Sequence, residues 1–214
     1  MPDHGARSLE GSTVLRLPLA VSDDLGDART GLILSRETRT TASLEACREI
    51  ANEHDERRVV CADDSAAREL PELAEIELIF ASDKPIPTRV LQALAANSRA
   101  DYLLLFRPER VSSSQQVSHD KIPRKDPGMT FLDGPNVDML IARERIVTSS
   151  STEVAFTVSA ALIDLRSGKL LRFGVHSGGG SRSEDRYMGF AEAPPAAPIL
   201  AEIMRDLGNA VLED

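Results

Sequence analysis

Residues 152–177 read TEVAFTVSAALIDLRSGKLLRFGVHS, and this stretch decides the fold. Apolar side chains recur at every second position on both sides of Ser167-Gly168, which is the pattern of two strands joined by a tight turn. Gly168 supplies the positive φ angle that a two-residue turn requires. The stretch therefore predicts an antiparallel β-hairpin.

A two-residue turn also determines which residues of the hairpin face each other. It pairs Leu162 with Phe173 and Ala160 with Val175, so that these side chains share one face. A three-residue loop would set Leu162 opposite Arg172 and mix charged with apolar side chains, so the first register is favoured. The face predicted to turn inward carries Val154, Phe156, Val158, Ala160, Leu162, Phe173 and Val175.

The rest of the chain alternates between strand and helix patterns. The apolar run at 102–106 is unbroken, which suits a strand covered on both faces. The predicted strands cover residues 12–21, 31–37, 57–64, 74–82, 102–106 and 139–148. Amphipathic periodicity predicts helices over residues 42–53, 65–73, 86–98 and 196–212.

These elements predict an α/β sandwich of the α+β kind. A mixed sheet carries 102–106 at its centre and the C-terminal antiparallel hairpin toward one side. Helices cover this sheet, and the C-terminal helix packs on it. We expect a flexible tail at 1–12 and a single domain at 13–214. The domain would contain a long Ser/Pro/Gly-rich loop at 112–136.

Composition excludes several classes of function. The net charge of −9 and the low aromatic content of 4% argue against a nucleic-acid-binding protein. No apolar run approaches the roughly 18–20 residues that a transmembrane helix needs. The first twelve residues lack the apolar segment of an export signal, so a cytoplasmic location is the alternative to an exported chain.

The HSGGGS motif, which comprises His176 and the glycines at 178–180, invites a catalytic interpretation. An oxyanion loop of the His-Gly-Gly-Gly kind serves a nucleophile in a Gly-x-Ser-x-Gly elbow, and this chain has no such elbow. In the favoured register His176 lies opposite Ser159 on the polar side of the hairpin. We therefore expect the glycines to end a strand and predict no catalytic residue and no cofactor. The alternative is a small-ligand-binding protein or a hydrolase with its pocket around His176 and Gly178–Gly180.

Metal-ligating residues are too loosely spaced to predict a metal site. Cys47, His54 and Cys61 offer three ligands without the regular spacing that zinc sites show. Either Asp63 or Asp64 is expected to cap a helix beside a favourable helix dipole, which accounts for both aspartates without a metal. Cys47 and Cys61 form either one disulfide or two buried thiols.

Three apolar residues stand inside the polar loop, namely Met129, Phe131 and Leu132. They would either tuck beneath the loop as a small cluster or serve as an anchor for a partner.

Three segments carry a resemblance to a known family: RADYLLLF at 99–106, SAALIDLRSGKLL at 159–171, and the closing helix at 196–212. In them the chain resembles periplasmic lipoprotein domains related to the curli-secretion lipoprotein. That group includes the amino-terminal domain of the Tol-system translocation protein and the lipoproteins that activate peptidoglycan synthases. Members place a helix before an Ala-Asp-Tyr strand and a hairpin with an Asp-x-x-x-Gly-Lys turn before a terminal helix. Here Ala100–Tyr102 and Asp164–Lys169 match.

The resemblance implies a non-enzymatic accessory or adaptor protein of the bacterial cell envelope. Its location would be periplasmic or associated with the outer membrane, although this chain shows no export signal and no lipid-bearing cysteine. Its partners would be other envelope proteins or further copies of itself. The expected binding surface combines the 112–136 loop with the hairpin face around Arg172 and His176.

Overall fold

The structure is a computed structural model, and its described residues are 9, 11–20, 26–27, 32–55, 58–62, 70–82, 84–123, 144–185 and 190–213. The chain forms two compact units. The first comprises residues 1–113, 154–180 and 195–214, and the second comprises 114–153 and 181–194. The expectation of a single domain over 13–214 stays a prediction.

A mixed five-stranded sheet forms the centre of the fold. Its strand order is β4 (Arg58–Cys61), β1 (Thr13–Leu19), β5 (Tyr102–Pro123), β6 (Glu144–Asp164) and β7 (Lys169–Asp185). β1 runs parallel to both β4 and β5. The predicted central position of the apolar run at 102–106 is confirmed, because β5 is the middle strand. Two short strands, β2 (Gly26–Asp27) and β3 (Leu32–Ile33), form a separate antiparallel pair.

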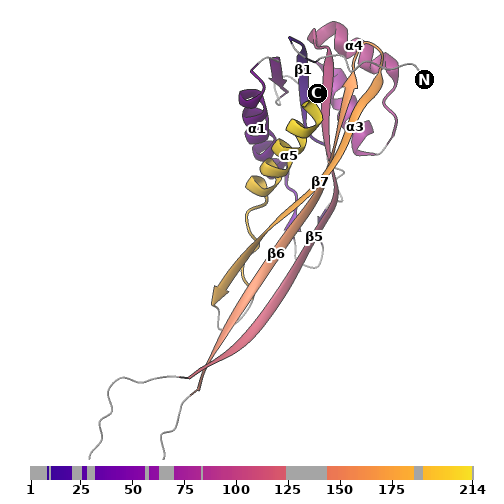
Figure 1. Ribbon diagram of the computed structural model, residues 1–214. Coiled ribbons are helices and arrows are strands. Elements are labelled where there is room, and N and C mark those ends of the chain that lie inside the picture. Colours follow the sequence, from indigo (N-terminus) through magenta and orange to yellow (C-terminus); the bar gives the residue numbers. More distant parts are fainter. Residues whose placement is uncertain are drawn as a thin grey trace, which may run out of the picture. The chain divides into compact units, whose positions relative to one another are not determined.

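Helices cover both faces of the sheet in the first unit, and the predicted α+β class is confirmed. α1 (Arg36–Glu53) and α5 (Ala196–Leu212) lie on one side, and α3 (Pro71–Ala81) and α4 (Thr88–Ser98) lie on the other (Figure 1). Two apolar cores follow from this arrangement. The α1/α5 core contains Val14, Leu104, Phe106, Phe156, Val158 and Met204, among others. The α3/α4 core contains Leu15, Leu17, Ile76, Leu94, Leu103 and Leu165, among others.

Two predicted strands are wrong. The strand expected at 74–82 is helix α3, because Leu73 and Ile76 are buried at helical spacing while Leu78 is 70% exposed. Pro71 stands in its first turn, where a proline needs no backbone N–H partner. The strand expected at 31–37 is only the two-residue β3, and Ser35 caps α1 by accepting from the N–H of Thr38 at 3.1 Å.

A disulfide joins Cys47 of α1 to Cys61 of β4, across a sequence separation of 14 residues. The bridge ties the shortest strand of the sheet to the helix that covers it. Of the two states that the sequence left open for these cysteines, the structure has the bridged one.

The loop predicted over 112–136 differs from the structure in its first half, because β5 continues as strand to Pro123. In the second unit Ser114 Oγ lies 3.3 Å from Glu153 Oε2, and Ser118 Oγ lies 2.6 Å from Ser149 Oγ. Residue numbers rise along β5 while they fall along β6, so these strands run antiparallel. Polar strands of this kind lack the apolar alternation that identifies a strand in a sequence.

The amino-terminal tail also differs from expectation at one described position. Leu9 is buried in the α1/α5 core, and Ser12 donates its backbone N–H to the carbonyl oxygen of Leu9 at 3.1 Å. The predicted flexible tail at 1–12 therefore contains at least one anchored residue.

The predicted register of the hairpin is wrong. Thr157 Oγ1 lies 2.9 Å from Ser177 Oγ, so these two side chains share a face. The register with Leu162 opposite Phe173 would place them on opposite faces, because side chains alternate along a strand. The structure therefore shifts β7 by an odd number of residues. Phe173 and Val175 leave the predicted inward face and are 57% and 55% exposed.

The turn is also longer than the predicted two residues. Residues 165–168 connect the strands, and the N–H of Gly168 donates to the carbonyl oxygen of Asp164 at 2.7 Å. The Asp164 carboxylate accepts from the backbone N–H groups of Arg166 and Ser167. Leu165, the first residue of this turn, is fully buried in the α3/α4 core. A tighter turn would remove Leu165 from that packing.

Candidate functional site

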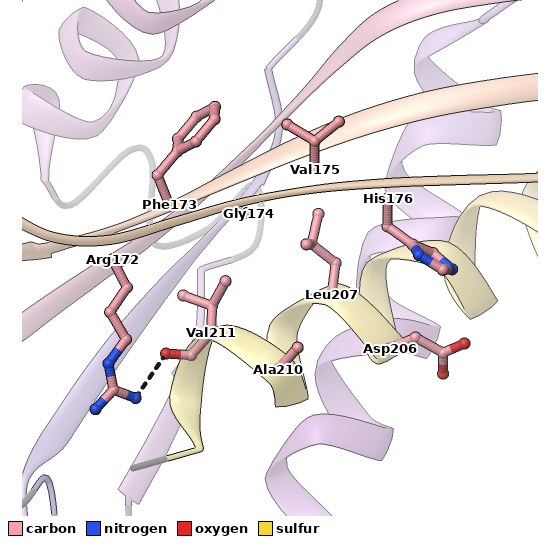
Figure 2. A pocket seen from close by; sticks show the side chains of 9 residues that line it. All are labelled: Arg172, Phe173, Gly174, Val175, His176, Asp206, Leu207, Ala210 and Val211. Atoms are coloured by element: carbon pink, nitrogen blue, oxygen red, sulfur yellow. Dashed lines mark hydrogen bonds between the residues drawn. The ribbon is translucent and has the colours of Figure 1, made fainter.

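A groove lies between β7 and α5, entirely within the first unit (Figure 2). Its volume is about 610 Å³. Residues from both elements line it: Arg172, Phe173, Gly174, Val175, His176, Asp206, Leu207, Ala210 and Val211. Since β7 is the last strand of the sheet, the groove runs beside a sheet edge.

Two glycines let α5 approach β7 closely. A Cβ atom on Gly174 would lie 2.8 Å from Leu207 Cδ1, and one on Gly178 would lie 2.8 Å from Ile203 Cγ1. Both distances are shorter than a carbon–carbon contact allows. The even-numbered face of β7 therefore faces the helix, with glycines where the two elements touch. A third glycine, Gly179, is restricted on its other side, because a Cβ there would lie 2.5 Å from the carbonyl oxygen of Val154.

Arg172 closes one end of the groove. Its Nη1 donates to the carbonyl oxygen of Val211 at 3.1 Å (Figure 2). The same atom donates to the carbonyl oxygen of Glu213. These carbonyl groups belong to the last turn of α5 and the residue that follows, where a cation is favoured. Arg172, predicted as a partner-binding residue, thus caps a helix and is half-buried.

His176 is exposed and lines the groove together with Asp206 of α5. The Asp206 carboxylate pairs with Arg205 at 2.7 Å, and this hydrogen bond raises the pKa of Arg205. The groove lining contains His176 but none of Gly178–Gly180, since Gly178 packs against Ile203. This groove therefore contains the histidine of the alternative hypothesis without its triple glycine.

The opposite face of β7 is apolar and uncovered by any described helix. Leu171, Phe173 and Val175 stand at alternate positions and are 45%, 57% and 55% exposed. Figure 2 shows Phe173 and Val175 on one side of the strand, and Arg172 and His176 on the other, toward α5. We call Leu171, Phe173 and Val175 the outer face of β7. Among the described strands β6 is the only neighbour of β7, so its outer backbone edge pairs with no described strand.

Sequence reasoning missed the outer face because it placed Phe173 and Val175 in the core. One signal could have found it. Gly174 and Gly178 stand four residues apart on the even-numbered face, opposite a strongly amphipathic terminal helix. Glycines at such spacing mark a close approach of a helix to a strand, which leaves the odd-numbered side chains on the other side.

The other predicted site residues, Met129, Phe131 and Leu132, lie outside the described residues. Within the described part of the chain, no group of three or more His, Cys, Asp or Glu side chains could hold a metal ion. None of the helices in that part is long and apolar enough to cross a membrane.

The fold and the groove define the class as a helix-covered α+β sandwich whose apolar edge strand, among the described strands, lies beside its terminal helix. No protein-family model matches the chain, and no curated protein matches it. Solved structures do resemble the chain. The PelC dodecamer from Paraburkholderia phytofirmans has 13% identity and a TM-score of 0.40, with 95% of this chain and 89% of that chain covered.

Two further similar structures are of named bacterial proteins. Lipoprotein GNA1162 from Neisseria meningitidis has 14% identity and a TM-score of 0.40, over 94% of this chain and 97% of that chain. The LpoB C-terminal domain from Salmonella enterica has 12% identity and a TM-score of 0.38, over 82% of this chain and 86% of that one. These neighbours match the resemblance to envelope lipoprotein domains seen in the sequence. Likeness at this level describes the fold alone, and the function is argued from this chain's own residues.

Proposed function

We propose that this protein is a non-enzymatic accessory or adaptor protein of the bacterial cell envelope that acts through contacts with other proteins. The binding surface would be the outer face of β7 together with the groove beside α5, where His176 is exposed. The predicted contribution of Met129, Phe131 and Leu132 to the same function stays a proposal.

The observation that carries the proposal is the exposure of the outer face on an edge strand. Soluble proteins usually protect such edges with charged residues, prolines or a covering element, because an open apolar edge invites pairing with another chain. Here Leu171, Phe173 and Val175 are exposed in sequence alternation, beside a groove of about 610 Å³. Adjacent exposed apolar side chains of this kind mark a protein interaction site.

The Cys47–Cys61 disulfide supports the envelope location. Disulfides form and persist in the bacterial periplasm and in secreted proteins, whereas cytosolic thiols are mostly kept reduced. A periplasmic or outer-membrane-associated chain is therefore the location we propose.

A second candidate function is a small-ligand-binding protein or hydrolase that uses the groove. It is favoured by one observation, namely that His176 and Asp206 both line the groove. It is weakened by the pairing of Asp206 with Arg205, which already engages this carboxylate at 2.7 Å. This candidate requires that His176→Ala abolish hydrolysis or ligand binding, whereas the adaptor function requires only that protein capture depend on the outer face.

The adaptor function predicts that a variant combining Leu171→Thr, Phe173→Thr and Val175→Thr loses its envelope partners. Threonine retains the strand propensity of these positions and removes the apolar contact area. We expect the amount of partner captured from envelope extract by chemical cross-linking to fall by roughly tenfold or more, as for the loss of a hot spot.

The matched control is Leu78→Gln, because Leu78 is also an exposed leucine, 70% accessible, but lies on α3. Capture by this control should equal that of the parent protein. Equal capture by the triple threonine variant and the parent would contradict the proposed binding surface.

A further inference from the structure

We infer that the partner binds as an added β-strand, in which apolar residues alternate with acidic ones, along the free edge of β7. This inference rests on the proposed function, since it specifies the chemistry of the partner at the same surface. Three features of β7 carry it: the open backbone edge, the apolar outer face and the charge of the strand.

The backbone edge determines the conformation of the partner. β7 is a terminal strand of the sheet, with β6 as its only described strand neighbour. A row of backbone N–H and C=O groups along such an edge is satisfied best by another extended chain. A helix laid on the outer face would cover the side chains but would leave these backbone groups to water.

Side-chain alternation determines the apolar half of the partner. In an added strand every second side chain points to the side of Leu171, Phe173 and Val175, within about 5 Å of its cross-strand neighbour. All three are exposed, and Val175 is β-branched while Phe173 is aromatic. Both residue types form favourable cross-strand pairs with apolar residues. The partner residues on this side are therefore apolar.

The charge of β7 determines the partner side chains that point to the groove side. From Lys169 to Gly180, β7 carries Lys169, Arg172 and His176 and contains no carboxylate, although the whole chain has a net charge of −9. Arg172 and His176 point toward the groove (Figure 2). The one acid in the groove lining, Asp206, is already paired with Arg205 at 2.7 Å. Partner side chains on the groove side are therefore acidic.

The same charge argues against a second copy of this chain as the partner. In-register parallel pairing of β7 with another β7 would bring Lys169 and Arg172 of one copy beside the same cations of the other, which is unfavourable. An acidic strand from a different protein would instead form favourable charge pairs with these cations.

The experiment uses the whole protein and a synthetic peptide of about ten residues, a usual strand length, in which valine alternates with glutamate. We expect saturable binding by calorimetry that weakens by roughly tenfold or more with Phe173→Thr and is unchanged with Leu78→Gln. A peptide with lysine in place of every glutamate should bind at least ~tenfold more weakly. Equal binding of the glutamate and lysine peptides would overturn the inference.

Two N-methylated peptides test the strand geometry. Methylation of alternate residues blocks the N–H groups along one edge of an extended peptide only. We expect one of the two methylated forms to lose binding and the other to retain it. Retention by both forms would overturn strand addition. Strand addition would also be overturned if neither peptide displaced an envelope partner whose capture still depends on Phe173. In that case the adaptor function would stand.

A dimer of the protein alone, seen by sedimentation and lost with Phe173→Thr, would identify a second copy as the occupant and contradict the inference. Failure of the triple threonine variant to lose any envelope partner would instead contradict the proposed function itself.

Discussion

Arg16 shows at the scale of one residue how far the core departs from a simple apolar interior. It is 1% exposed, and its Nη1 donates to the carbonyl oxygen of Ser43. Its Nη2 lies 3.9 Å from Met204 Sδ, and its guanidinium carbon lies 4.9 Å from the centre of the Phe106 ring. No described carboxylate pairs with it, and its Nε has no hydrogen-bond partner. Burial lowers the pKa of Arg16 to about 9.

Replacing this buried cation by an apolar side chain of similar length should stabilise the protein. We predict that Arg16→Met raises the free energy of unfolding at pH 7 by about 1–3 kcal/mol, since an uncompensated buried charge is removed. Ser43 keeps its carbonyl inside α1, where the helix supplies a donor.

The pH dependence of that gain has a definite sign. The pKa of Arg16 is lower in the folded protein than in the unfolded chain, so above about pH 9 the unfolded chain binds more protons. The parent protein therefore recovers stability from this residue as the pH rises through 9, and the advantage of the methionine variant shrinks. Urea unfolding of the parent and of Arg16→Met, from neutral to alkaline pH, measures how the difference in their free energies of unfolding changes.

The control for this prediction is Arg205→Met, because Arg205 pairs with Asp206 at 2.7 Å on the surface. It should give no stabilisation. A loss of stability in Arg16→Met, or a gain that does not change with pH, would contradict the account of Arg16.

Strand β1 illustrates what the sequence could and could not indicate about this residue. The segment STVLRLPLAV predicted the strand that the structure contains. A lone arginine in an alternating pattern points to solvent more often than into a core. The burial of Arg16 depends on α1 and α5 covering that face, which no local pattern in β1 records.

At the scale of elements, long periodic segments could be predicted and short ambiguous ones could not. The stripe of Leu200, Ile203, Met204, Leu207 and Val211 predicted α5, and all five residues are buried. α3 was mistaken for a strand because its short apolar run fits both periods. The hairpin was predicted, but its register was wrong, and its turn is longer than predicted and includes Leu165, which packs in the α3/α4 core. The candidate site depends on that register, so the predicted register placed Phe173 and Val175 in the core and missed the outer face.

The disulfide is the element-scale feature with the clearest energetic consequence. It holds the four-residue β4 to α1 and closes a loop with a sequence separation of 14. Restriction of the unfolded chain by a loop of this length contributes about 3 kcal/mol. We predict that Cys47→Ala with Cys61→Ala lowers the free energy of unfolding by about that amount.

Urea unfolding with and without a reducing agent checks this prediction. The parent protein should shift to a lower midpoint on reduction, whereas the double alanine variant should not respond. An unchanged midpoint for the reduced parent would contradict a stabilising role for the bridge.

At the scale of the whole molecule, the central claim is that β7 presents two different faces. Its even-numbered side chains turn toward α5, where Gly174 and Gly178 permit close packing, and its odd-numbered apolar side chains face outward. Composition and periodicity could predict the helix-covered mixed sheet. They could not predict this orientation, because a one-residue slip exchanges the two faces of a strand while leaving its composition unchanged.

Cysteine labelling in the native protein tests this orientation most directly. Both native cysteines are bridged, so an introduced thiol is the only reactive one. Phe173→Cys should react with a maleimide nearly as fast as it does in the unfolded chain. Phe156→Cys, at a position that is 1% exposed, should react at least ~100-fold more slowly, because labelling must await opening of the core. Protection of Phe173→Cys to the same degree as Phe156→Cys would contradict the account.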